Sequence, residues 1–456
     1  MSTTAARHSA AHHPSGAHDA APPSSASATG IEVDDTRPVD LDEARAMVEA
    51  LALADLPVGT VGLEVEGHAV VWDDPTARPS FEVLSAVASR VADLPAGGRT
   101  TLEPGGQVEV SSAPHPDIDT ALVAMAQDTA HLREALAQEG LGWALLGSDP
   151  LRPPQRVNPA PRYAAMERFF SATGDTRDHG ATMMCSTAAL QLNLQPGRPD
   201  QWVDRVRRAQ RLGPLLTALS GSSAFLAGRD TGWHSARQRA WTGLGELRAG
   251  PIDDIDPARA WARRALEAPV VLLPVGPGGA GVGVVGSEPA TGGAAGAGRL
   301  PSRTLQEWLV DPAGWPAATV GDVRRQLSTL FPPVRLRGWL ELRCLDSLPD
   351  RWWPAVAALT TAWMDDETVH PVVDAAVAET AGRWHEAAST GLGDDALRRT
   401  AATLLDAALP VVPERVRPAV EELAELAATG RSPGSLIVDD LRRRGPAVVL
   451  EEMSRA

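Results

Sequence analysis

Residues Gly62–His68 read GLEVEGH and lie inside Val58–Trp72, the clearest strand pattern in the chain. Side chains two residues apart in a strand point to the same face, so Glu64 and Glu66 are expected side by side, with apolar residues on the opposite face. Neighbouring carboxylates repel each other, and burial raises that cost unless a cation or hydrogen-bond donors lie between them. Taken alone, the segment also fits a half-exposed strand with a solvated polar face.

Two later segments repeat this combination of acidic and apolar residues. In TLEPGGQVEVSSAP (Thr101–Pro114), Glu103 precedes a Pro-Gly-Gly turn and Glu109 lies on a short predicted strand. In RLRGWLELRCLD (Arg335–Asp346), Glu341 lies on a third strand between two leucines. If the three strands share one face of a sheet, four or five carboxylates gather there.

A hard cation makes such a cluster of carboxylates tolerable. Mg²⁺ takes oxygen ligands and usually keeps positions for substrate phosphates. Arg343 is two residues from Glu341 and is expected on the same face. The combination favours phosphoryl transfer from a nucleotide. A structural face or a calcium-binding face remains an alternative at this point.

Other polar residues interrupt apolar segments. Gln191 and Asn193 alternate with leucines on a predicted strand, where amides could bind a ribose, a phosphate or a substrate, or form a buried polar ladder. Arg237 and Arg239 lie between tryptophans and suit bidentate binding of a carboxylate or phosphate, although they also fit a solvated helix face. Tyr163 is the one tyrosine in the chain and is equally compatible with a core position.

Composition excludes several classes of protein. The net charge of −16 disfavours a nucleic-acid or anionic-membrane partner, and no apolar run approaches the roughly 20 residues that span a bilayer. The chain contains no lysine, so all 42 basic side chains are arginines and a phosphate-loop lysine is excluded. The two cysteines, Cys185 and Cys344, cannot form a disulfide framework, which fits a cytoplasmic protein, and both are expected to be small buried residues.

The pattern along the chain predicts an α+β fold, with an antiparallel sheet that has one metal-binding face and is surrounded by helices. Residues 1–35 are rich in Ala, Ser, Pro and His and are expected to form a disordered tail without a secretory signal. The catalytic body is expected over 36–349, with a flexible Gly/Ala insertion at 276–299, and a helical C-terminal part of the same domain over 350–456. The other predicted strands are Gln107–Ser111, Leu190–Leu194, Val270–Val275 and Gly338–Leu345, and the predicted helices include Leu41–Ala54, Ser80–Leu94, Ile118–Gln138, Gln201–Leu219 and Ala258–Glu267.

Six motifs occur in a fixed order: GLEVEGH, EPGGQVEVSSAP, DPLRPPQRVNPAPRYAAM, MMCSTAALQLNLQ, GWHSARQRAW and TLFPPVRLRGWLELRCLD. Together they resemble the glutamate–cysteine ligases of the plant and actinobacterial type, and in particular the actinobacterial branch that serves ergothioneine biosynthesis. The resemblance runs from about Val39 to near the C-terminus. The long tail and the Gly/Ala insertion have no counterpart in the pattern of this family.

The resemblance implies a glutamine-synthetase-like fold and a ligase that joins the γ-carboxyl of L-glutamate to the amine of L-cysteine through γ-glutamyl phosphate. ATP is then a co-substrate, and two or three Mg²⁺ ions are the cofactor. The implied metal ligands are Glu64, Glu66, Glu103, Glu109 and Glu341. The implied binding and catalytic residues are Arg343 at the ATP phosphates or the reacting carboxylate, Arg237 or Arg239 at glutamate, Gln191 and Asn193 in the nucleotide and substrate pocket, and Arg162 and Tyr163 near the thiol pocket.

Three alternatives compete with this interpretation. The chain could be a carboxylate–amine ligase of the same fold with another amine acceptor, or a non-catalytic metal-binding relative. A glycosidase with paired carboxylates is disfavoured because no Trp/Asp-rich sugar motif is present. The oligomeric state is left open.

Overall fold

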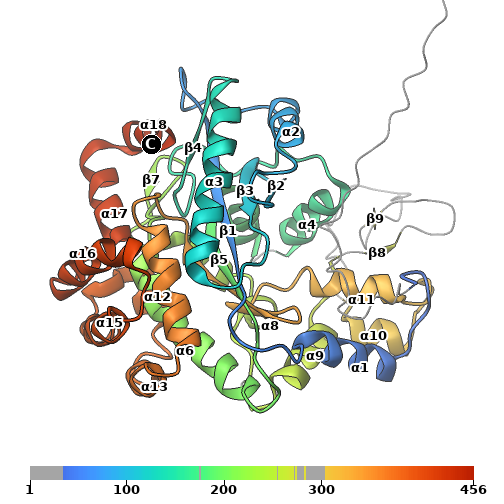
Figure 1. The fold of residues 1–456 in the computed structure, drawn as a ribbon. Helices are drawn as coiled ribbons and strands as arrows, with labels where there is room; N and C mark the ends of the chain where they lie inside the picture. Colours follow the sequence, from blue (N-terminus) through green and yellow to red (C-terminus); the bar gives the residue numbers. More distant parts are fainter. Residues whose placement is uncertain are drawn as a thin grey trace, which may run out of the picture. The chain divides into compact units, whose positions relative to one another are not determined.

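The GLEVEGH strand lies at the centre of a sheet in the computed structural model. This strand is β1 (Val61–Val71). Within the described residues, seven strands form the sheet, six of them in the order β10-β11-β5-β1-β3-β2 (Figure 1). The seventh strand, β4, pairs with the C-terminal half of β1, next to the part of β1 that pairs with β5. Every pairing is antiparallel. The other strands are β2 (Arg99–Leu102), β3 (Gln107–Ser111), β4 (Leu141–Ala144), β5 (Ala189–Leu194), β10 (Val334–Leu336) and β11 (Leu340–Asp346).

The structure describes residues 34–173, 176–253, 255–271 and 303–455, and the backbone of the short paired strands β8 (Leu273–Pro274) and β9 (Val282–Gly283). Residues Asp35–Ala456 form one compact unit, and all elements named here belong to it. The predicted tail lies outside the described residues apart from its last two positions. Most of the predicted insertion lies outside them as well.

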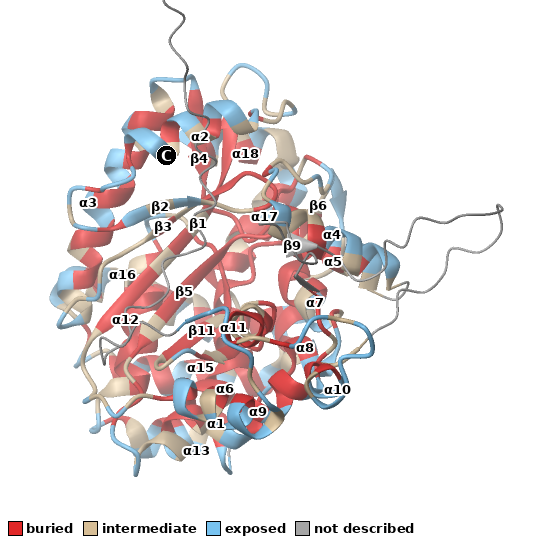
Figure 2. Ribbon diagram, turned by 90° about the vertical axis from the view of Figure 1, so that its right-hand side faces the viewer, coloured by how far each residue is buried: buried red, intermediate tan, exposed pale blue. Residues whose placement is uncertain are grey.

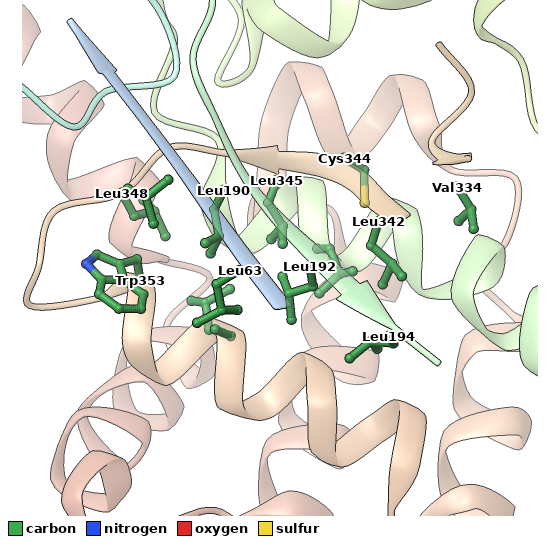
Figure 3. Close-up of a cluster of buried hydrophobic side chains, with 14 of the residues drawn as sticks. Leu63, Leu190, Leu192, Leu194, Val334, Leu342, Cys344, Leu345, Leu348 and Trp353 are labelled. Atoms are coloured by element: carbon green, nitrogen blue, oxygen red, sulfur yellow. The ribbon is translucent and has the colours of Figure 1, made fainter. Parts of the chain in front are cut away.

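One face of the sheet is apolar and forms the core. Figure 3 shows Leu63 of β1, Leu192 of β5 and Leu342 of β11 pointing to the same side, where Trp353 at the start of α12 lies. These side chains are almost completely buried, whereas the residues that alternate with them in β1 face the other side. The alternation of GLEVEGH therefore separates a core face from a polar face.

Helices surround the sheet. Helix α6 packs against β11, α12 against β5, and α3 against β1, β3 and β4. Figure 2 shows the central strands buried and the outer faces of the helices exposed, and the C-terminal helices gather around α6 and α12 (Figure 1). The helices are α1 (Leu41–Ala52), α2 (Phe81–Arg90), α3 (Ile118–Ala137), α4 (Pro161–Ala172), α5 (Arg177–Ser186), α6 (Trp202–Ser220), α7 (Ala236–Thr242), α8 (Glu246–Ala249), α9 (Pro257–Glu267), α10 (Leu305–Val310), α11 (Val320–Leu327), α12 (Trp353–Asp365), α13 (His370–Ala378), α14 (Trp384–Thr390), α15 (Asp395–Ala408), α16 (Arg417–Ala428), α17 (Pro433–Arg444) and α18 (Pro446–Arg455).

The glycine at position 67 of GLEVEGH has a packing reason. A Cβ atom there would lie 2.5 Å from Nε1 of Trp143 and 2.9 Å from a methyl group of Leu145. Trp143 lies on β4, is fully buried and donates its indole N–H to the Val108 carbonyl at 3.2 Å. Gly67 thus leaves room for the indole that joins β4 to β3 under the central strand.

The predicted α+β class with an antiparallel sheet is confirmed. The predicted strand Gln107–Ser111 has the observed bounds, and the prediction Val58–Trp72 is longer than β1 at both ends. The prediction Val270–Val275 is too long, because β8 covers two residues. Both cysteines are free and buried, as expected, and burial raises the pKa of Cys344 to about 12.

Candidate active site

The register of the sheet brings the predicted acidic residues together. Glu66 of β1 lies opposite Glu109 of β3, and Glu64 lies opposite Gln191 of β5. On the far side of β5, Asn193 lies opposite Glu341 of β11. Residues paired in this way point to the same face, so strands β3, β1, β5 and β11 contribute polar side chains to one surface.

The two amides of β5 hold the two carboxylates of β1. Asn193 donates through Nδ2 to Oε1 of Glu64 at 2.8 Å, and Gln191 donates through Nε2 to Oε1 of Glu66 at 2.7 Å. The backbone N–H of Ala189 donates to the second oxygen of Glu66 at 2.8 Å. These neutral donors fix the direction of the carboxylates without neutralising their charge. The predicted contact of Gln191 and Asn193 with a nucleotide or substrate stays a prediction.

Glu109 and Glu103 extend the acidic surface toward the edge of the sheet. The hydroxyls of Thr101 and Ser111 each donate to Oε1 of Glu109 at 2.9 Å. Glu103 precedes the tight Pro-Gly-Gly turn, in which Gly105 donates its N–H to the Gln107 side chain at 2.9 Å. The turn therefore holds Glu103 beside the strand that carries Glu109.

The pKa values of the four glutamates are raised. Burial, followed by the charges of Glu109 and Glu341, raises the pKa of Glu64 to about 7. Burial and the charge of Glu103 raise the pKa of Glu109 to about 7, and burial with the charges of Glu109 and Glu103 raises that of Glu66 well above its ordinary value. Burial also raises the pKa of Glu103. The cluster consequently favours a proton or a cation among its oxygens.

These oxygens suit a hard divalent cation. Among the residues that the structure describes, no three acidic, histidine or cysteine side chains are grouped closely enough to hold an ion by themselves. Mg²⁺ is commonly bound by one or two carboxylates together with waters and phosphate oxygens. The donor set thus fits Mg²⁺ bound jointly by protein and nucleotide.

Glu341 lies within a group of arginines. Its side chain is 0% exposed, and Arg335 binds it in a bidentate manner, with Nη2 donating to Oε1 at 2.8 Å and Nε donating to Oε2. Arg343 Nη1 lies 3.2 Å and Arg337 Nη1 lies 3.3 Å from Oε1. Although burial opposes ionisation, these guanidinium groups hold the pKa of Glu341 well below its ordinary range. All of these contacts are with arginine, and the predicted role of Glu341 as a metal ligand stays a prediction.

Arg237 and Arg343 share one aromatic ring. Each guanidinium carbon lies 5.2 Å from the ring centroid of Trp241, and Arg237 donates through Nη2 to the Arg343 carbonyl at 2.7 Å. Arg237 is 1% exposed, yet its Nε and Nη1 have no hydrogen-bond partner, and neither does Nε of Arg343. Unpaired buried donors of this kind are suited to an anionic ligand. A small pocket beside Arg343 is lined by Trp241 and Phe331, whose rings pack edge to face with centroids 5.4 Å apart.

Arg237 is buried and Arg239 is exposed, although both lie on α7. Arg239 is exposed on the other side of α7, where its guanidinium lies 5.2 Å from the ring centroid of Trp233. Arg237 instead acts on the acidic surface, where its charge lowers the pKa of Glu66 against the larger effect of burial. Of the two arginines, Arg237 is therefore the one beside the candidate site.

Helix α4 carries Arg162 and Tyr163 near Glu103. The charge of Glu103, together with burial, raises the pKa of Tyr163. The charge of Arg162 lowers the pKa of Glu103, against the larger effect of burial. Arg162 donates through Nη2 to the Ser328 carbonyl at 2.9 Å. Both residues thus border the acidic surface, and their predicted role at the thiol substrate stays a prediction.

Sequence reasoning missed several residues of this surface. Arg335 and Arg337 bind Glu341, and Trp339 donates its indole N–H to Asn193 Oδ1 at 2.7 Å. Arg335 lies on β10 opposite Glu341, whereas Arg337 and Trp339 lie in the turn between β10 and β11, where Gly338 has a φ of 84°. Strand alternation in the sequence therefore does not identify these three residues as partners of Glu341 and Asn193. None of the described helices is long and apolar enough to cross a membrane.

The chain is similar to known proteins over most of its length. Glutamate–cysteine ligase EgtA of Mycolicibacterium smegmatis is 40% identical over 419 residues, covering 91% of this chain and 95% of the relative. Glutamate–cysteine ligase EgtA of Mycobacterium tuberculosis is 39% identical over 434 residues, covering 93% of this chain and 97% of the relative. The crystal structure of a glutamate–cysteine ligase from Francisella tularensis in complex with AMP superposes with a TM-score of 0.51 at 14% identity, over 88% of each chain, and shows a shared fold. The model of glutamate–cysteine ligase family 2 matches residues 60–451, and the chain therefore belongs to this family.

Proposed function

We propose that the protein is an ATP-dependent glutamate–cysteine ligase that forms γ-L-glutamyl-L-cysteine. The observation that carries the proposal is the polar face of the sheet, where an acidic surface and unpaired arginine donors lie side by side. Family membership and the two EgtA relatives, each named a glutamate–cysteine ligase, support the same reaction. The open antiparallel sheet also fits the glutamine-synthetase-like arrangement that the sequence motifs imply.

The reaction needs two steps because a carboxylate is a poor acyl donor. An oxygen of the glutamate γ-carboxylate attacks the γ-phosphorus of ATP, and ADP leaves. The amine of cysteine then attacks the acyl carbon of γ-glutamyl phosphate, so that the C–N bond forms, the C–O bond to phosphate breaks and the amine loses a proton. Phosphorylation supplies the leaving group that the carboxylate lacks.

The acidic surface is proposed to bind the nucleotide through Mg²⁺. Glu64, Glu66, Glu103 and Glu109 would hold two or three ions together with the phosphate oxygens, and Glu341 is included as a further ligand. Bound Mg²⁺ neutralises charge on the phosphates while two anions approach each other. The amides that orient Glu64 and Glu66 keep these carboxylates in place before any ligand binds.

The arginines are proposed to bind the anionic parts of the substrates. Arg237 holds the α-carboxylate of glutamate by its charge and by one of its unpaired donors, Nε or Nη1, which leaves the γ-carboxylate free to reach ATP. Arg343, fixed by Glu341, faces the reacting carboxylate or the γ-phosphate. Tyr163 and Arg162 border the position of the cysteine thiol, and Gln191 and Asn193 line the nucleotide and substrate pocket. Arg239 is the less suitable glutamate ligand, because it is exposed over Trp233.

The same proposal includes the physiological role. The product would supply ergothioneine biosynthesis in the cytoplasm, in line with the motifs of the actinobacterial branch and with two free, buried cysteines.

A substrate-omission assay tests the proposed function. The purified protein is incubated with ATP and Mg²⁺, and phosphate release is measured with glutamate, with cysteine and with both. The proposal predicts rapid release only with both amino acids, and γ-glutamylcysteine in the mass spectrum. Release that is equally fast with a different amine, such as α-aminobutyrate, favours the ligase with another acceptor, whereas no release under any combination contradicts the proposal.

A further inference from the structure

Asp346, the last residue of β11, is a buried carboxylate without a role in the proposed reaction. It is 0% exposed, and its Oδ2 accepts hydrogen bonds from the Ser223 hydroxyl at 2.6 Å and the Ser222 N–H at 3.0 Å. Its Oδ1 accepts a hydrogen bond from the Ser235 hydroxyl at 2.8 Å. Three donors around one carboxylate stabilise its charge within the core.

The two serine hydroxyls link Asp346 to the first turn of α7. Ser235 is the N-cap of this helix and accepts the Gln238 N–H at 3.0 Å, while Ser223 accepts the Arg237 N–H at 3.0 Å. Each hydroxyl has a single hydrogen, which it donates to Asp346, so its lone pairs are left for the helix N–H groups. An ionised aspartate, which accepts at both oxygens, therefore sets the polarity of the whole network.

Asp346 also acts on Arg237 directly. Arg237 Nη1 lies 3.9 Å from Oδ1 of Asp346, which is close enough for charge attraction and too far for a hydrogen bond. The guanidinium is thereby held against Trp241 while its Nε and Nη1 stay unpaired. An arginine placed in this way keeps a donor on each of two edges of the guanidinium, either of which can bind a ligand carboxylate.

We propose that Asp346 is a positioning residue, which fixes the start of α7 through Ser223 and Ser235 and orients the Arg237 guanidinium for the α-carboxylate of glutamate. The inference rests on the proposed function. Asp346 itself does not contact a substrate, and its effect on catalysis passes through Arg237.

Steady-state kinetics of Asp346→Asn and Ser223→Ala test the inference. An amide accepts at one oxygen only, so Asp346→Asn reverses one serine hydroxyl and removes the charge that holds Arg237. We expect the KM for glutamate to rise about tenfold or more, with the KM values for ATP and cysteine within about twofold of the parent. Ser222→Ala is the matched control, because its hydroxyl binds the Ser347 carbonyl and the Gly147 N–H rather than Asp346. This control should leave the KM for glutamate unchanged.

A double-mutant cycle separates positioning from a general structural effect. In the Arg237→Lys background, Asp346→Asn should no longer raise the KM for glutamate, because the group through which it acts is already absent. Additive effects of Asp346→Asn and Arg237→Lys on the KM for glutamate would overturn the inference. An unchanged KM for glutamate in both Asp346→Asn and Ser223→Ala would also overturn it. If Asp346→Asn does not fold, Ser223→Ala supplies the same cycle. Lack of γ-glutamylcysteine formation by the parent protein would contradict the proposed function instead.

Discussion

Glu64 combines a fixed direction with an unsatisfied charge. Asn193 holds one carboxylate oxygen, and burial together with the charges of Glu109 and Glu341 raises the pKa of Glu64 to about 7. A residue placed only for stability would not carry this repulsion. We interpret it as a preformed ligand position whose repulsion is relieved when Mg²⁺ and the nucleotide bind.

Glu64→Gln tests this interpretation. Glutamine keeps the shape and can still accept the hydrogen bond from Asn193, but it removes the charge. We expect kcat to fall by at least about a hundredfold with the melting temperature unchanged or higher. Glu421→Gln, at an exposed position of α16, is the control and should retain parental turnover. Activity of Glu64→Gln within a few-fold of the parent would refute the metal-ligand role.

The raised pKa predicts a pH dependence of stability in the absence of divalent cations. Burial and its acidic neighbours raise the pKa of Glu64 from 4.5 to about 7 in the folded protein. Between these values the folded state keeps a proton that the unfolded chain has lost, so the free energy of unfolding decreases as pH rises. Between pH 4.5 and pH 8, the free energy of unfolding of the parent should fall by about 2–3 kcal/mol more than that of the Glu64→Gln variant. Urea unfolding in EDTA across this range measures the difference, and parallel pH profiles for the two proteins would contradict the account.

Arg237→Lys tests the proposed glutamate ligand. Lysine keeps the positive charge but loses the planar pair of donors, so the KM for glutamate should rise about ten- to a hundredfold, with smaller effects on ATP and cysteine. Arg239→Lys is the matched control on the same helix and should behave as the parent, because its side chain is exposed. A defect confined to ATP would instead show that Arg237 serves phosphate, and an effect of Arg239→Lys alone would reverse the assignment.

At the scale of elements, β1 determines how close its neighbours approach. Gly67→Ala places a methyl group 2.5 Å from the Trp143 indole, so β4 or the indole must move. We expect a loss of about 1–3 kcal/mol in the free energy of unfolding, measured by urea denaturation. Gly382→Ala is the control, because nothing lies within 4 Å of its added methyl, and it should stay within about 0.5 kcal/mol of the parent. Equal stability of both variants would show that the contact with Trp143 is not a constraint.

The sequence predicted the elements better than their contacts. Alternation alone placed Glu64 and Glu66 on one face and predicted the strand that carries Glu109, because a period of two residues is visible within a single segment. The register between strands depends on residues far apart in the chain, so the contact of Asn193 with Glu64 was not foreseen. The arginine contacts of Glu341 are local, within the hairpin of β10 and β11, but the position of the hairpin turn was not predicted from the sequence.

At the scale of the whole molecule, the core and the polar surface are two faces of the same sheet. The leucines of β1, β5 and β11 point to one side of the sheet (Figure 3), where α12 packs against β5 and α6 against β11. The acidic and amide side chains alternate with these leucines along the strands and face the other way. The core therefore fixes the spacing of the candidate ligands before any substrate binds. The sequence motifs predicted this polar face and the family of the protein. The proposed role of Asp346 could be inferred only from the packing of α7 against β11.

Oxygen transfer from glutamate to phosphate tests the central claim most directly. L-glutamate with both γ-carboxyl oxygens labelled with ¹⁸O is incubated with the protein, ATP, Mg²⁺ and cysteine, and both products are analysed by mass spectrometry. If the γ-carboxylate is activated as γ-glutamyl phosphate, one ¹⁸O atom appears in the released phosphate and the other remains in the amide carbonyl of γ-glutamylcysteine. Unlabelled phosphate formed alongside γ-glutamylcysteine would contradict the acyl phosphate, and the absence of γ-glutamylcysteine would contradict the ligase itself.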